Sequence, residues 1–131
     1  MNGVMLMVEG DNMDTDLKKK LEEKAKDIRV DIIDMLCAAG SGHPGGSLSM
    51  ADMFSYLYFS GTLEMDPGNP AKKDRDRIVL SKGHACPVLY AALAEKGYFD
   101  KSQLKTLRKL GSILQGHPDM RKLPGIEMST G

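Results

Sequence analysis

Only one segment of this chain has the sequence of a buried β-strand, and this limits the folds that it can form. Residues 77–81 (Arg-Ile-Val-Leu-Ser) are short and mostly apolar, like a strand of a parallel sheet that is covered on both faces. A single strand cannot make a sheet, because each strand needs a neighbour for its hydrogen bonds. We therefore expect an incomplete, mostly helical part of an α/β domain, whose parallel sheet with helices on both faces is completed by residues outside this chain.

The remaining patterns predict four helices and one domain. Residues 1–13 are predicted to be a flexible leader, and residues 14–131 a single partial domain. The first helix begins at Asp14 or Thr15, either of which can cap it, and ends at Gly40. Its apolar residues recur three and four apart, which is typical of a helix with one buried stripe.

The other three predicted helices follow shorter patterns. Residues 48–59 are apolar nearly all round, so this helix is expected to be buried, with Ser47 or Ser49 as its cap. The next helix begins near Pro87 and stops at Gly97. The last one runs from Asp100 to Gly111, with Leu104, Leu107 and Leu110 along one side.

Composition excludes several classes of function. The 18 basic and 18 acidic residues cancel, so no strong field attracts nucleic acid or an anionic membrane. The chain has no Trp, and it has no apolar run of the ~20 residues that a membrane span requires. Its two cysteines are too few and too distant for a disulfide framework. These features predict reduced thiols and a cytoplasmic location.

All three histidines lie in short motifs that contain glycine. The motifs are Ser-Gly-His-Pro-Gly-Gly around His43, Ser-Lys-Gly-His-Ala around His84 and Gly-His-Pro around His117. A histidine on a glycine loop can reach a ligand, and imidazole exchanges protons near neutral pH. Pro44 stiffens the first loop, which favours a positioned acid or base over a flexible connector. From the residues alone, a turn histidine bonded to backbone remains an equal alternative for His84.

The place of His84 in the chain favours an anionic ligand. It comes directly after the predicted strand and just before the helix at Pro87. Ligands of open α/β sheets bind beyond the carboxyl ends of the strands, and a helix N-terminus favours a diphosphate. The sequence lacks both the P-loop and the dinucleotide-binding glycine patterns.

A zinc site made of His43, His84 and His117 is a different hypothesis. Zinc sites of this kind often have two ligands close together in the sequence. Here the histidines are 41 and 33 residues apart, so the spacing gives this hypothesis no support.

Four motifs in order resemble the transketolase family. They are residues 41–47 (SGHPGGS), residues 77–85 (RIVLSKGHA), residues 116–118 (GHP) and residues 125–131 (GIEMSTG). Together they follow the order and spacing of the N-terminal, diphosphate-binding domain of transketolases, from about Leu17 to the end of the chain. Deoxyxylulose-phosphate synthases share the architecture but differ in the amino-acid sequences of these loops.

The resemblance implies a role for each matching residue. It implies that His84 contacts thiamine diphosphate and that Gly131 begins a glycine loop against this cofactor. It implies that His43 and His117 face the substrate, where they handle protons and hydrogen bonds while a two-carbon ketol unit passes from a ketose phosphate to an aldose phosphate. The carbanion chemistry would belong to the cofactor.

The resemblance also implies components that this sequence lacks. Family members bind Mg²⁺ through a Gly-Asp-Gly motif and a later Asn, and nothing in this chain matches them, so no metal ligand is assigned here. The pyrimidine-binding domain would come from a partner subunit or from the C-terminal remainder, in a homo- or hetero-oligomer. We therefore expect an N-terminal fragment of a transketolase of the pentose phosphate pathway, inactive alone. The alternatives are a non-catalytic remnant that keeps an interaction surface and a deoxyxylulose-phosphate synthase.

Overall fold

The computed structural model describes residues 14–131, and its regular elements are all helical. The predicted leader, residues 1–13, lies outside the described residues. In chain order the helices are α1 (Thr15–Ala39), α2 (Pro44–Leu48), α3 (Ala51–Phe59), the 3₁₀ turn η1 (Gly83–Ala85), α4 (Cys86–Lys96) and the 3₁₀ helix η2 (Lys101–Thr106). None of the helices in this part of the chain is both long and apolar enough to cross a membrane.

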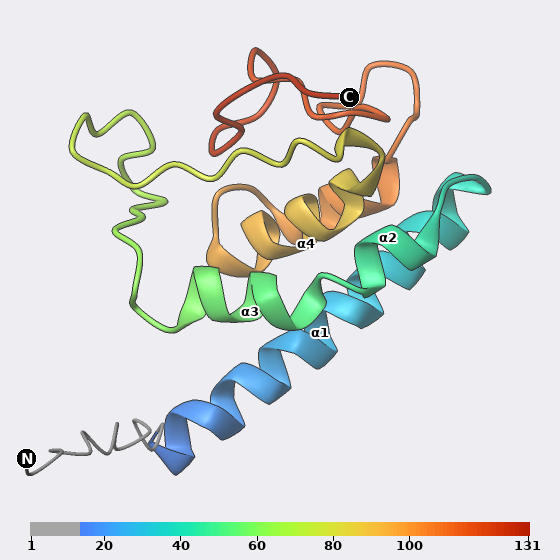
Figure 1. Ribbon diagram of the computed structural model, residues 1–131. Coiled ribbons are helices and arrows are strands. Elements are labelled where there is room, and N and C mark those ends of the chain that lie inside the picture. Colours follow the sequence, from blue (N-terminus) through green and yellow to red (C-terminus); the bar gives the residue numbers. More distant parts are fainter. Residues whose placement is uncertain (1–13) are drawn as a thin grey trace, which may run out of the picture.

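Helix α1 is the support on which the other helices pack. The Asp14 carboxylate accepts a hydrogen bond from the backbone N–H of Asp16 at its start, and Gly40 ends it in the left-handed conformation, as the sequence predicts. Its buried face contacts α3, α4 and η2. Figure 1 shows α3 and α4 lying against this long helix, with the loops of residues 61–82 and 107–131 on the far side of α4. The core is therefore a helical layer covered by loops.

Helix α4 forms the centre of the core. Pro87 lies in its first turn, and Gly97 ends it with φ 96°, both as predicted. All nine residues from Cys86 to Ala94 are buried. A helix that is buried on all sides must be covered by several elements, which here are α1, α3 and the loop segments above it.

The predicted strand at residues 77–81 is not a strand in this structure. The segment is extended, but the described residues provide no neighbouring strand for it. Leu80 is buried, whereas Val79 is 48% exposed. The backbone carbonyl of Leu80 instead accepts a hydrogen bond from the Thr130 hydroxyl at 2.6 Å. The parallel sheet with helices on both faces is not visible in this part of the chain.

The helix predicted over residues 48–59 is divided in two. Helix α2 ends at Leu48, and α3 begins at Ala51 without a side-chain cap, so neither Ser47 nor Ser49 caps it. The Ser49 hydroxyl donates to the carbonyl of Gly46 at 3.1 Å, a local bond that competes with helix continuation. Helix α3 is also buried on one face only, because Met53 is 50% exposed and Tyr56 43% exposed.

The helix predicted over residues 100–111 is shorter than expected. Asp100 caps η2 by accepting from the N–H of Ser102 at 2.7 Å, but regular structure stops at Thr106. Arg108 adopts a left-handed conformation with φ 62°, which a continuing helix does not allow. Leu110 is consequently fully exposed instead of lying in the core.

A charged cluster joins α1, α4 and η2. The Lys101 ammonium donates to both Glu95 and Asp31, with 3.0 Å to Asp31 Oδ1, and Lys24 Nζ lies 2.6 Å from Glu95 Oε2. Burial raises the pKa of Asp31 to about 6, although Lys101 opposes this shift. Burial disfavours the charged form of Glu95 too, but the hydrogen bonds from Lys101 and Lys24 outweigh it and hold its pKa at about 2. We call Lys24, Asp31, Glu95 and Lys101 the carboxylate–lysine cluster.

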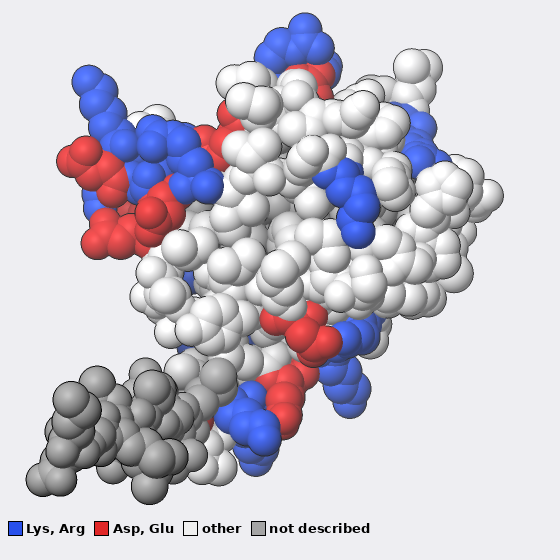
Figure 2. Space-filling model, viewed as in Figure 1, with Lys and Arg blue, Asp and Glu red and all other residues white. Residues whose placement is uncertain are grey.

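The connector between α3 and α4 also carries many charged side chains. Figure 2 shows acidic and basic side chains together on the loop of residues 64–77, while the middle of the same face is largely uncharged. Within this connector, Arg75 forms an ion pair with Glu127 (Nη2 to Oε2, 2.5 Å), and both side chains are mostly buried. This pair joins the connector to the closing segment, residues 120–131.

Candidate ligand site at the histidine loops

The three predicted histidines are brought together through glycines of their own loops. The rings of His43 and His84 lie edge to face, with centroids 5.9 Å apart. A Cβ placed on Gly131 would lie 2.7 Å from Cδ2 of His117, and one placed on Gly83 would lie 2.5 Å from the Cα of Gly131. The four residues predicted to form the site, His43, His84, His117 and Gly131, therefore line one continuous surface.

The side chains of the site are available to a ligand. All three histidines are exposed, although His84 and His117 lie next to buried residues of their loops. Gly46 faces the same place, since a Cβ there would be 3.6 Å from His84 Nε2 and 3.7 Å from Lys82 Nζ. The Lys82 ammonium donates to the Gly46 carbonyl at 3.3 Å. The site thus combines imidazoles, one ammonium and closely approaching backbone, which suits an anion with hydroxyl groups beside it.

The His84 loop is fixed from two sides. The Ser47 hydroxyl, which is buried in α2, donates to the carbonyl of Ala85 at 3.3 Å. On the other side, the Thr130 hydroxyl holds the carbonyl of Leu80. These bonds join α2, η1 and the closing segment, so the site depends on contacts between residues that are far apart in the sequence.

The His117 loop is held from below by α4. The Tyr90 hydroxyl donates to the carbonyl of Gln115 at 2.8 Å and to that of His117 at 3.3 Å. The Cys86 thiol donates to the carbonyl of Gly116 at 3.2 Å. Burial raises the pKa of Cys86 to about 11, so the thiol stays protonated and continues to donate. The sequence predicts a scaffolding role for Cys86 and no role for Tyr90, and the two residues lie one helical turn apart on α4.

We expect Tyr90→Phe to lower the free energy of unfolding by about 1–2 kcal/mol, because two carbonyls lose a buried donor. Urea denaturation measures this loss. Tyr56→Phe is the matched control, since Tyr56 is 43% exposed, and it should change the stability little. Equal effects from the two substitutions would contradict a specific role for the Tyr90 hydroxyl.

The zinc hypothesis receives no support from this geometry. In residues 14–131 there is no group of three or more His, Cys, Asp or Glu side chains that could hold a metal ion. His117 lies beside Gly131, which in turn lies against Gly83 in the His84 loop. The histidines therefore line a surface and do not converge on one point.

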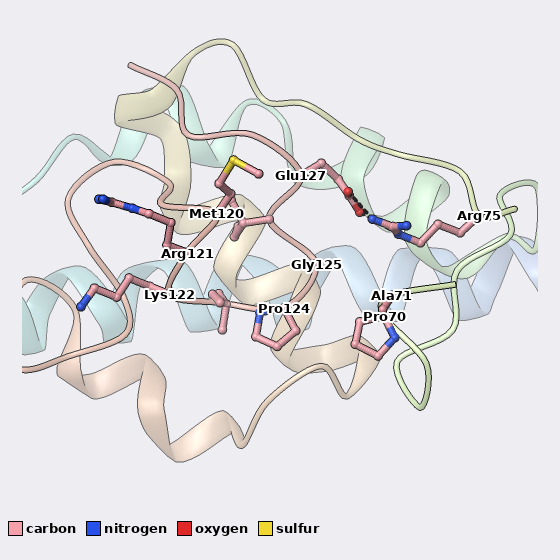
Figure 3. Close-up of a pocket in the computed structure, with 11 residues that line it drawn as sticks. Pro70, Ala71, Arg75, Met120, Arg121, Lys122, Pro124, Gly125 and Glu127 are labelled. Carbon is pink, nitrogen blue, oxygen red and sulfur yellow. Dashed lines mark hydrogen bonds and ion pairs between the residues drawn. The ribbon is translucent and has the colours of Figure 1, made fainter. Parts of the chain in front are cut away.

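A large cavity lies away from the histidines. It has a volume of about 470 Å³ and lies between the connector and the closing segment, and its lining includes none of the histidines. Figure 3 shows Arg75 and Glu127 pointing toward one another at its edge, while Arg121 and Lys122 point away from this pair. Because the Arg75 guanidinium is already neutralised by Glu127, we place the functional site at the histidines.

Comparison with known proteins assigns the chain to a family. Residues 20–131 match the family described as "Transketolase, thiamine diphosphate binding domain". The 6-deoxy-6-sulfo-D-fructose transketolase subunit of a Clostridium strain is 48% identical over 111 residues, which are 85% of this chain and 40% of that protein. Human transketolase is 41% identical over 111 residues, which are 85% of this chain and 18% of that protein.

Solved structures agree with the sequence comparison. Transketolase from Leishmania mexicana superposes with a TM-score of 0.81 at 38% identity, over 85% of this chain and 17% of that one. Transketolase from Campylobacter jejuni gives a TM-score of 0.78 at 39% identity, over 91% of this chain and 18% of that one. The chain thus spans two fifths or less of the length of these relatives.

The fold is that of part of a cofactor-binding domain. The chain belongs to the transketolase family, and it matches the N-terminal domain that binds thiamine diphosphate.

Proposed function

We propose that this chain is part of a transketolase that transfers a two-carbon ketol unit from a ketose phosphate to an aldose phosphate. The observation that carries the proposal is that His43, His84 and His117 share one surface around the contact between Gly83 and Gly131. When bound, thiamine diphosphate would supply the carbanion chemistry. This chain's residues would bind and orient the reactants and exchange protons with them.

Each side chain has a proposed task that fits its position. His84, with the Lys82 ammonium near it and α4 beginning just after it, would contact the cofactor next to Gly131. His43, beside His84, and His117, beside Gly131, would donate to and accept from oxygen atoms of the sugar. Lysine and imidazole groups suit the anionic diphosphate and the hydroxyl groups of a ketose.

Mg²⁺ is also proposed as a cofactor, with ligands from outside the described residues. Mg²⁺ needs several oxygen ligands. In residues 14–131 there is no cluster of three or more His, Cys, Asp or Glu side chains that could hold a metal ion. Because the chain spans two fifths or less of its relatives, we propose that these ligands and the pyrimidine-binding domain belong to the remainder of the enzyme or to a partner subunit. The relative from Phocaeicola vulgatus is one subunit of an apulose-4-phosphate transketolase, which supports a two-subunit arrangement.

The test is to assemble the chain with the missing domains, as a longer polypeptide or with a partner subunit, and to measure ketol transfer. We expect His84→Ala to weaken binding of thiamine diphosphate at least tenfold, about 1.4 kcal/mol. His117→Ala should lower kcat by about 10²–10⁴ while cofactor binding is retained. Lys105→Ala, a change at an exposed residue outside the site, is the control.

The outcomes separate the proposal from its alternatives. Association with a pyrimidine-domain partner without ketol transfer would favour a non-catalytic remnant. The identity to the Clostridium subunit favours testing 6-deoxy-6-sulfo-D-fructose as a donor beside the ketose phosphates. Activity that is independent of all three histidines would exclude the proposed site.

A further inference from the structure

Arg108 connects the two loops that carry His43 and His117. Its guanidinium Nη1 donates to the hydroxyl of Ser41 at 3.1 Å, two residues before His43. Its backbone N–H donates to the carbonyl of Leu114 at 3.0 Å, three residues before His117. The guanidinium also lies against Gly116, where a Cβ would be only 3.2 Å from Nε. One residue thus contacts both loops directly.

The backbone of Arg108 is held in an unfavourable conformation. Its φ is 62°, and among residues 14–131 it alone combines a side chain with a φ in the left-handed region. Such a conformation persists only where the surroundings enforce it, and strained residues concentrate at functional sites. Here the buried Leu107 on one side and the bond to Leu114 on the other enforce it. The turn sends the guanidinium toward Ser41 instead of along the axis of η2.

We propose that Arg108 is a positioning residue that fixes the His43 and His117 loops relative to each other. This inference rests on the proposed function, in which both histidines act on one sugar. Two loops that belong to different parts of the sequence need a rigid connection, since small errors in placement lower the rate of reaction. The planar guanidinium can contact both loops at once. A lysine ammonium at the same position has all its N–H donors on one nitrogen atom and would not span the two loops.

The first test is made by NMR on the 131-residue chain, without cofactor. Arg108→Gly removes the side chain, and glycine adopts the positive φ without strain. The variant therefore reports the effect of losing the guanidinium and not an effect of changed backbone conformation. We expect the ring signals of His43 and His117 both to move, while those of the buried Phe54 stay in place. Millimolar guanidinium ion should move the histidine signals back toward the wild type. Lys109→Gly, at the exposed neighbour, is the control and should move neither signal.

The second test uses Arg108→Lys in the assembled enzyme. We expect kcat to fall about tenfold, with the KM for thiamine diphosphate within twofold of the wild type. If the ring signals of the two histidines do not respond to Arg108→Gly, or if guanidinium does not reverse the response, the inference is wrong. If the NMR result holds but no ketol transfer is found, the connection stands and the proposed function fails.

Arg108→Lys keeps the NMR test available if Arg108→Gly does not fold. It retains the positive charge and the backbone conformation but removes the planar guanidinium. It should therefore move the same two ring signals to a smaller extent. Unchanged signals in a folded Arg108→Lys chain would overturn the inference.

Discussion

Replacing Gly83 with alanine is expected to destabilise the chain by about 1–3 kcal/mol and to separate the closing segment from η1. The added Cβ would lie 2.5 Å from the Cα of Gly131, 2.7 Å from its nitrogen and 2.8 Å from the carbonyl of Thr130. All three contacts are with backbone, so no side chain can rotate away to make room. The closing segment has to move, and with it Gly131 and its contact with His117.

Urea denaturation of Gly83→Ala measures the loss in stability, and the ring signals of His117 report the displacement. Gly45→Ala is the matched control, because it changes another glycine of the histidine loops and its Cβ would meet nothing within 4 Å. Since Gly45 is in α2, alanine there should leave the stability unchanged or raise it slightly. A Gly83→Ala chain as stable as the Gly45→Ala chain would show that the contact between Gly83 and Gly131 is not close.

Glu95→Gln should lower the free energy of unfolding by about 2–3 kcal/mol at neutral pH, because it removes the charge that binds two lysines in the carboxylate–lysine cluster. The pKa of Glu95 is lowered from 4.5 to about 2 in the folded chain, so the folded state binds fewer protons than the unfolded state between these values. The stabilisation is complete above pH 4.5 and is lost as the pH falls through about 2. The difference between variant and wild type should shrink over the same range.

Asp31→Asn should show the opposite pH trend in the same experiment. The pKa of Asp31 is raised from 3.8 to about 6, so its stabilising form is the neutral one, which is lost as the pH rises toward 6. Relative to the wild type, Asp31→Asn should therefore become more stable between pH 4 and 6. Denaturation at several pH values tests both residues, with Glu23→Gln and Asp34→Asn at exposed positions as controls. Parallel pH trends for the two variants would contradict the proposed charge states.

The sequence predicted the features that depend on local chemistry. The cap at Asp14, the stop at Gly40 and the limits of α4 are confirmed, because a capping carboxylate, a left-handed glycine and a first-turn proline act within a few residues. The membership in the transketolase family is confirmed as well. The histidine motifs were found because glycine lets the backbone approach a ligand closely and proline fixes the backbone beside His43 and His117. The roles of His43, His84, His117 and Gly131 remain predictions, although the structure places all four on one surface.

Features that depend on tertiary contacts could not be predicted in this way. The strand at residues 77–81 requires a neighbouring strand, and in the described part of the chain the carbonyl of Leu80 binds the Thr130 hydroxyl instead. The division of the predicted 48–59 helix follows from the bond between Ser49 and Gly46, and Leu110 is exposed because Arg108 turns the chain. The bonds from Tyr90 and Cys86 could not be predicted, since only the folded chain places the carbonyls of the His117 loop beside them.

The bond between Thr130 and Leu80 has a consequence for protein synthesis. The N-terminal part of a chain leaves the ribosome first, so His43 and His84 emerge well before the closing segment. Thr130 of that segment then has to bind Leu80, which is 50 residues earlier in the sequence. The helical layer is built from residues up to Thr106 and can form first, whereas the histidine surface is complete only after residues 120–131 have docked. A nascent chain stalled before Thr130 would therefore present a formed helical core together with His84 and His117 loops that are not yet fastened to each other.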